Sequence, residues 1–171
     1  MEITPWFSRK FPVIADNGLF PSIVERLIGT PLRLAHKLQG VSPMMLTEKE
    51  GEKWSVQEEA GHILDLEPLW FARFQDFQSA QEVLSEADLS NRKTFEAQHN
   101  DRDIQEILAA LATARGQLIA LLAALESSDL ERSALHPRMR TPMRPIDLAY
   151  FVAEHDDHHL ATITQRLQTL S

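Results

Sequence analysis

Apolar residues recur every three or four positions over four long stretches of the chain, the spacing that places them on one face of an α-helix. The predicted helices cover residues 21–40, 54–80, 101–125 and 145–170. No stretch alternates apolar and polar residues in the way typical of a half-buried strand. Four helices of this length, with no internal repeat, predict an all-α fold in which they pack as a four-helix bundle with long connecting loops.

Local signals support the helix boundaries. Ser55 and Glu58 form a capping box, in which each side chain satisfies a free N–H group at the start of a helix. Pro145 suits the first position of the last helix, where no N–H donor is needed. Two prolines, Pro31 and Pro68, fall inside predicted helices, and we expect a kink or bend at each.

The remaining segments are connections. Prolines and an Asn-Gly pair keep residues 1–20 irregular, and residues 84–101 and 127–145 form two further connections. Loops as long as 84–101 are uncommon unless they have a function, so we expect this one to cover a site. The whole chain, residues 1–171, is predicted to be one domain, because a chain of this length can bury a sizeable core.

Composition narrows the classes of function. The chain has 17 Lys and Arg residues against 25 Asp and Glu residues, a formal net charge of −8, which argues against nucleic-acid binding. The absence of cysteine excludes disulfides, zinc–thiolate sites and cysteine nucleophiles. The longest purely apolar run, 118–125, is far shorter than the roughly 20 residues that cross a bilayer. No signal peptide is recognisable, so we expect a cytoplasmic protein without a membrane partner.

Three of the seven histidines stand out by their positions. His155 and His159 are four residues apart, so they lie about one turn apart on the apolar, inward face of their helix. A helical projection of residues 54–80 places His62 on the inward face as well. Imidazoles from facing helices of a bundle can meet at one metal ion. Three neutral imidazoles suit Zn²⁺, Ni²⁺, Cu²⁺ or Fe²⁺ and leave positions open for water or substrate.

A purely structural role competes with metal binding. A buried histidine is commonly a core residue that is hydrogen-bonded to a neighbour, and in that case no metal is bound. Asp65, Asp156 and Asp157 are candidates to orient the imidazole N–H groups, although the last two also fit solvated positions on the helix. Glu58 lies one turn before His62, but the capping box already explains it.

Two segments carry a resemblance to a known family: WSVQEEAGHILDLEPLW at 54–70 and FVAEHDDHHLATI at 151–163. In order and spacing they resemble the two histidine-bearing stretches of the DinB-like superfamily, a group of bacterial four-helix metal-binding proteins. The resemblance implies that His62, His155 and His159 hold the metal. It also implies that the adjacent His158 does not.

The resemblance implies a function as well. Family members with known chemistry are metal-dependent hydrolases or thiol transferases, so we expect a divalent ion, Zn²⁺ or Ni²⁺, that activates water or a small-molecule thiol. A small-molecule substrate and a homodimer are expected. The alternative is a non-catalytic metal- or ligand-binding bundle, either a stress protein or a dimeric scaffold. Asp65 and Glu58 are the catalytic candidates, and the candidate pocket residues in the 84–101 connection are Asn91, Arg92 and His99.

Overall fold

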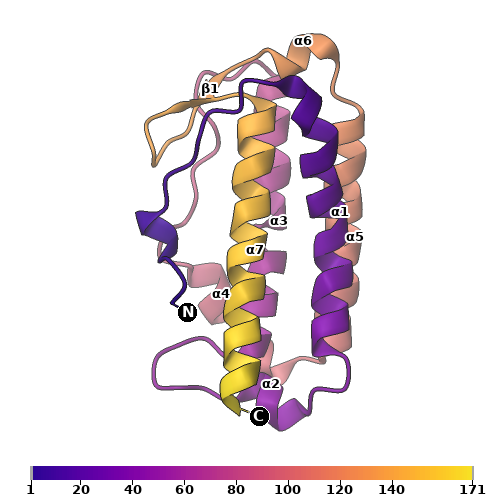
Figure 1. Cartoon of the computed structure of the whole chain (residues 1–171), viewed down its shortest axis with the longest axis vertical. Helices are drawn as coiled ribbons and strands as arrows, with labels where there is room; N and C mark the ends of the chain where they lie inside the picture. The colour runs from indigo at the N-terminus through magenta and orange to yellow at the C-terminus, as the bar shows by residue number, and fades with distance from the viewer. Residues whose placement is uncertain (1, 171) are drawn as a thin grey trace.

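Four long helices make up most of the molecule (Figure 1), and the computed structural model describes residues 2–170. The helices are α1 (Phe20–Leu38), α3 (Val56–Gln78), α5 (Ile104–Ala123) and α7 (Pro145–Leu170). Helix α3 packs against α5 and α7, and α1 packs against the same two helices, so the four form a closed ring around a common core. The prediction of an all-α four-helix bundle is confirmed.

The helix ends follow the local signals. Ser55 and Glu58 form both bonds of the predicted capping box at the start of α3. Pro145 is the first residue of α7. The predicted start of the third helix was early, because the side chain of Asp103 accepts a hydrogen bond from the backbone of Gln105 and caps α5 at Ile104. Helices α1 and α3 each run on through their internal prolines, Pro31 and Pro68.

The connections contain short elements that the hydrophobic pattern did not predict, because segments of two to five residues show no periodicity. They are η1 (Trp6–Ser8), η2 (Asn17–Leu19), α2 (Pro43–Thr47), α4 (Arg92–Glu96), η3 (His99–Asp101), α6 (Ser127–Leu130), β1 (Ala134–Leu135) and β2 (Pro142–Met143). The two strands pair as an antiparallel hairpin, and Val83 forms a parallel bridge to Leu135. The 84–101 connection is therefore folded over α3 rather than extended in solvent, with α4 and η3 both packed on that helix.

A buried arginine forms ion pairs that connect α5 to α3 and α7. Arg115 is 1% exposed and forms ion pairs with Glu67 of α3 and Asp156 of α7, at 2.5 and 2.7 Å. Helix α5 is long and apolar enough, by length and composition alone, to cross a membrane. Its central arginine is instead neutralised by carboxylates from two other helices of the bundle. The helix therefore serves here as a core element.

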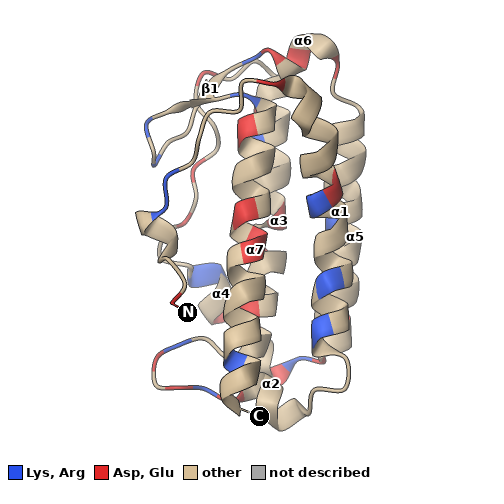
Figure 2. Ribbon diagram, viewed as in Figure 1, with Lys and Arg blue, Asp and Glu red and all other residues tan. Residues whose placement is uncertain are grey.

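Helix α7 is also fixed from outside by charge and by the N-terminal segment. Figure 2 shows basic segments along α1 and acidic segments along α7, and Asp157 forms ion pairs of 2.6 Å with both Arg26 and Arg33. Trp6 packs against Phe151 of α7 with its ring centroid 5.0 Å away. These contacts set the position of the α7 face that carries the paired histidines.

Candidate metal centre

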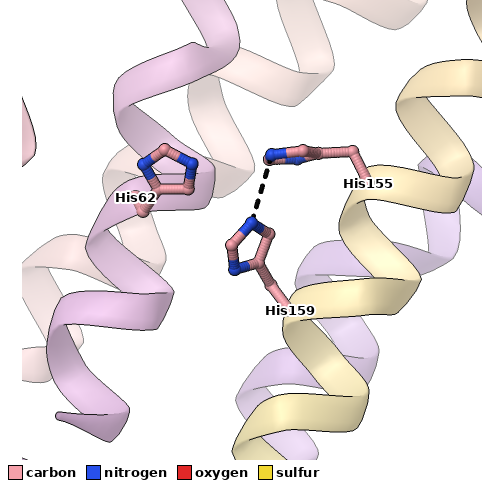
Figure 3. A group of neighbouring side chains, drawn as sticks. All are labelled: His62, His155 and His159. Atoms are coloured by element: carbon pink, nitrogen blue, oxygen red, sulfur yellow. Dashed lines mark hydrogen bonds between the residues drawn. The ribbon is translucent and has the colours of Figure 1, made fainter. Parts of the chain in front are cut away.

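Three histidines converge between α3 and α7. Figure 3 shows His62 projecting from α3 toward His155 and His159, which project from successive turns of α7. One nitrogen from each ring lies within 4.8 Å of the corresponding nitrogens of the other two. The Nε2 atoms of His155 and His159 are 3.1 Å apart. The structure thus brings together the three residues that the sequence selected as a group.

Burial keeps these imidazoles neutral. Desolvation, followed by the proximity of His159, lowers the pKa of His62 from 6.5 to about 3. Desolvation likewise lowers the pKa of His159 to about 4. The pKa of His155 also lies well below its usual value, because the ring is fully buried beside the other two. A neutral imidazole has a free lone pair, which is the form that binds a metal.

Two side chains hold the outer nitrogens of the group. Glu59 Oε2 lies 2.5 Å from Nδ1 of His159, and Thr94 Oγ1 lies 3.0 Å from Nδ1 of His62. When the Glu59 carboxylate is ionised, it accepts a hydrogen bond from the Nδ1–H group of His159. The proton is then on Nδ1, and the lone pair is on Nε2, which faces the other rings. Partners of this kind orient the ring and select the tautomer that a metal needs.

His155 shows why a cation fits the arrangement. Its Nδ1 is buried and has no hydrogen-bond partner among the described residues, while its Nε2 faces the Nε2 of His159. One proton placed between the two Nε2 atoms joins only these two rings and leaves His62 outside. A divalent ion is attracted by all three lone pairs at once. The donor set therefore fits a divalent transition metal.

A cavity opens beside the three histidines. It has a volume of about 350 Å³, and all three rings lie on its wall. The apolar and aromatic part of the remaining wall includes Trp6, Phe7, Trp54, Leu66, Leu69, Trp70 and Phe151. His158 also lines the cavity, although its Nδ1 lies 3.2 Å from the guanidinium of Arg9 rather than in the cluster. One side of the candidate metal site can thus be reached by a small molecule.

The two catalytic candidates lie outside this cavity. Glu58 closes the capping box of α3 and pairs with Lys49 at 3.0 Å. Asp65 is buried and lies 2.8 Å from Nε2 of His99. Burial raises the pKa of Asp65, but the hydrogen bond and charge of His99, the Thr94 hydroxyl and Lys93 together lower it further, so the net shift is downward. Neither carboxylate makes a hydrogen bond to the three histidines.

The three candidate pocket residues of the 84–101 connection lie in different places in the structure. Asn91 lines the cavity. Arg92 is exposed and lies 3.8 Å from Glu96 on the next turn. His99 is fully buried and its ring packs over Gly61, on the side of α3 where Asp65 lies. Asp156 and Asp157, which were candidates to orient imidazoles, form ion pairs to arginines instead.

No sequence pattern indicated a role for Glu59 or Thr94, the two residues bonded to the Nδ1 atoms of His159 and His62. Glu59 precedes His62 by three residues and so shares its helical face, but nothing in the sequence indicates which residue a carboxylate there would bind. Thr94 lies 32 positions after His62 in a segment without periodicity, so no pattern connected the two. Only the folding of α4 onto α3 brings Thr94 to the site.

Comparisons with known proteins agree with this architecture. The sequence model of the DinB superfamily matches residues 27–163. YfiT from Bacillus subtilis, described as a probable metal-dependent hydrolase with an unusual four-helix bundle topology, has a similar structure: the TM-score is 0.78 at 21% identity, covering 95% of this chain and 93% of that one. A mycothiol-dependent maleylpyruvate isomerase is similar with a TM-score of 0.67 at 8% identity, covering 93% of this chain and 62% of that one. No curated protein matches the sequence.

Proposed function

The chain belongs to the DinB superfamily, and from this premise we propose that it is a metal-dependent enzyme in which His62, His155 and His159 hold one divalent ion. The observation that carries the proposal is the convergence of three neutral, buried imidazoles at the wall of an open cavity. Zn²⁺ or Ni²⁺ is the proposed ion, since both accept imidazole nitrogen readily and the chain offers no thiolate.

The ion would supply a Lewis acid that lowers the pKa of water or a thiol, or that polarises a carbonyl group. The protein would supply orientation and a dry environment. Glu59 and Thr94 hold two of the rings by their Nδ1 atoms. Trp54 packs at a tilt against His62 with ring centroids 4.6 Å apart, and Trp6 packs edge-on against His155 at 5.0 Å, so that aromatic rings shield the imidazoles from water. Because Asp65 and Glu58 do not line the cavity, the proposal gives them no contact with substrate.

Two reactions fit this arrangement: hydrolysis of a small ester or amide, and transfer of a small-molecule thiol. The chain has no cysteine, so any thiol must come from a cosubstrate. Hydrolysis is supported by the description of YfiT as a probable metal-dependent hydrolase. Thiol transfer is supported by the mycothiol dependence of the isomerase. The alternative is a non-catalytic metal- or ligand-binding bundle. A bundle that only binds a metal would not need an open cavity beside the histidines, whereas a ligand-binding bundle would, so turnover must separate it from an enzyme.

We further propose that the protein is cytoplasmic, forms a homodimer and acts on a small molecule. We propose no nucleic-acid or membrane partner. The net charge of −8 supports the absence of a nucleic-acid partner. Light scattering on the purified chain would test the dimer directly, because the mass of a monomer is 19.5 kDa.

Turnover by the metal-loaded protein tests the proposed activity. We would assay hydrolysis of 4-nitrophenyl acetate, and conjugation of glutathione to 1-chloro-2,4-dinitrobenzene, with protein reconstituted with Zn²⁺ or Ni²⁺. The control is His155→Ala/His159→Ala under the same conditions. Activity in either assay that is lost in the double variant supports an enzyme. Stoichiometric metal without turnover in both assays would favour the non-catalytic bundle.

A further inference from the structure

A second polar group lies on the wall of the same cavity, away from the three histidines. Its central residue is Arg73, which follows His62 on α3 by 11 residues, about three helical turns. Arg73 is 1% exposed and lines the cavity. A buried arginine normally has a carboxylate partner, so the contacts of this one are informative.

Arg73 has no such partner. Its Nε donates to the carbonyl of Ser85 at 2.9 Å, and its Nη1 donates to Nε2 of His136 at 3.1 Å. Over residues 2–170, no Asp or Glu oxygen forms an ion pair with Arg73 within 4.0 Å, and its Nη2 makes no hydrogen bond. Arg115 is buried to the same degree but is bonded to two carboxylates. Of the two fully buried arginines in the described part of the chain, the fold thus neutralises Arg115 and leaves Arg73 with spare donors.

The charge on Arg73 persists despite this burial. Desolvation lowers its pKa to about 10, and the nearby carboxylate of Asp76, which forms no ion pair with Arg73, offsets part of this effect, so the guanidinium remains protonated at neutral pH. Its neighbour His136 is neutral, because burial and the nearby Arg73 lower the pKa of that imidazole to about 4. His136 can therefore accept a hydrogen bond from Arg73 but cannot balance its charge.

A second arginine adds to the positive charge of this part of the cavity. Arg138 lines the cavity, lies over the ring of Phe7 at 5.1 Å, and forms no ion pair among the described residues. Two carboxylates, Glu86 and Asp88, also line the cavity, but both are exposed, and Asp88 already accepts hydrogen bonds from Ser90 and Arg92. The buried part of this wall is therefore cationic.

Trp70 connects the cationic wall to the histidines. The guanidinium of Arg73 lies 5.4 Å from the Trp70 ring, and the ring of His155 lies 5.5 Å from it. One small molecule that lies along Trp70 can therefore reach both groups. The cavity, at about 350 Å³, is at the small end of the range for ligand pockets.

We propose that Arg73, assisted by Arg138, binds the carboxylate of a small substrate whose apolar body lies against Trp70 and Phe151 and whose reacting group faces the three histidines. A guanidinium with free N–H groups matches the two oxygens of a carboxylate, and the aromatic walls match an apolar body. The substrate class is thus a small organic acid. The use of this subsite in a reaction rests on the proposed function, but the binding of the acid group does not.

Binding of a matched acid and amide tests this proposal. We would titrate the full chain, stripped of metal with EDTA, with 3-phenylpropanoate and with 3-phenylpropanamide, which differ only in the charged group. Wild type should bind the acid about 10- to 100-fold more tightly, as expected for charge-assisted hydrogen bonds. Arg73→Gln should lose this preference, and Arg73→Lys should retain part of it. The control Arg92→Gln removes an exposed charge outside the cavity and should keep the full preference.

The proposal is overturned if wild type binds the acid no more tightly than the amide, which includes binding neither, or if Arg73→Gln keeps the preference. If Arg73→Gln does not fold, Arg138→Gln is the substitute, because Arg138 makes no hydrogen bond that folding depends on, and it must reduce the preference. Because the protein is metal-free throughout, failure here leaves the metal site untouched, and failure to bind metal leaves this result untouched.

Discussion

The Glu59 carboxylate lies 2.5 Å from Nδ1 of His159, and this contact joins α3 to α7 at the candidate metal centre. The carboxylate is buried without a lysine or arginine bonded to it, and desolvation raises its pKa to about 7. An arrangement that destabilises a charged group in this way is typical of a site where a positive ion offsets the charge. The ion proposed for the three histidines would supply that charge.

Glu59→Gln should therefore weaken metal binding. The variant keeps the size of the side chain but removes the charge behind His159, and loss of such a partner typically costs about 10- to 100-fold in metal affinity. Competition with a chromophoric zinc chelator measures the change. Glu58→Gln is the matched control, since glutamine still completes a capping box and Glu58 does not contact the histidines. Equal affinities for the two variants would contradict a role for Glu59.

Thr94 should act in the same way on His62. Thr94→Val is close to isosteric but removes the hydroxyl that lies 3.0 Å from Nδ1 of His62, so the ring loses its orienting bond. Zinc affinity should fall by about tenfold, the lower end of the range for such partners. Thr94→Ser retains the hydroxyl and should restore most of the affinity. If the valine and serine variants bind zinc equally, the hydroxyl has no part in the site.

These two residues mark the limit of what the sequence could predict. The four helices and the inward face of His155 and His159 follow from periodicity alone, because helical geometry fixes which residues share a face. The partner of His159 lies 100 positions away, and that of His62 lies in a short helix without periodicity. Arg73 was missed for a related reason, since what sets it apart is that no carboxylate forms an ion pair with it in the folded chain.

Gly61 should be sensitive to substitution because of His99. A Cβ atom at Gly61 would overlap the His99 ring, which is itself held by Asp65. Gly61→Ala should lower the free energy of unfolding by about 1–3 kcal/mol through overpacking. Gly116→Ala, in α5, has nothing within 4 Å of the added methyl group and should leave stability unchanged or raise it by roughly 0.5–1 kcal/mol. Urea unfolding of both variants gives the comparison, and a fully stable Gly61→Ala would show that His99 can move away freely.

The Arg115 network should matter far more to stability than the exposed ion pairs. Arg115→Met leaves the buried carboxylates of Glu67 and Asp156 without a positively charged partner and should cost about 3–5 kcal/mol. Arg33→Met removes an exposed pair to Asp157 and should cost at most about 1 kcal/mol. Thermal unfolding of both variants beside wild type measures the difference. If both variants lose the same stability, the ion pairs of Arg115 do not hold α3, α5 and α7 together.

Stability should also fall in acid in part through His136. Burial keeps the pKa of this imidazole at about 4 in the folded chain, whereas the unfolded value is 6.5. Between these pH values only the unfolded state takes up the proton, so folding is progressively disfavoured as the pH falls from 6.5 to 4. Relative to His136→Gln, the wild-type unfolding constant should rise by up to about tenfold per pH unit in this window. Parallel pH profiles for the two proteins would contradict this assignment.

Metal content is the most direct test of the central claim, that His62, His155 and His159 form a metal site. We would measure zinc and nickel by mass spectrometry on untagged protein, on His155→Ala/His159→Ala, and on His36→Ala, which removes an exposed histidine of α1. We expect about one ion per chain in wild type and in His36→Ala, and none in the double variant. Wild-type protein without stoichiometric metal, even after incubation with Zn²⁺ or Ni²⁺, would contradict it and leave the three histidines as core residues of the bundle.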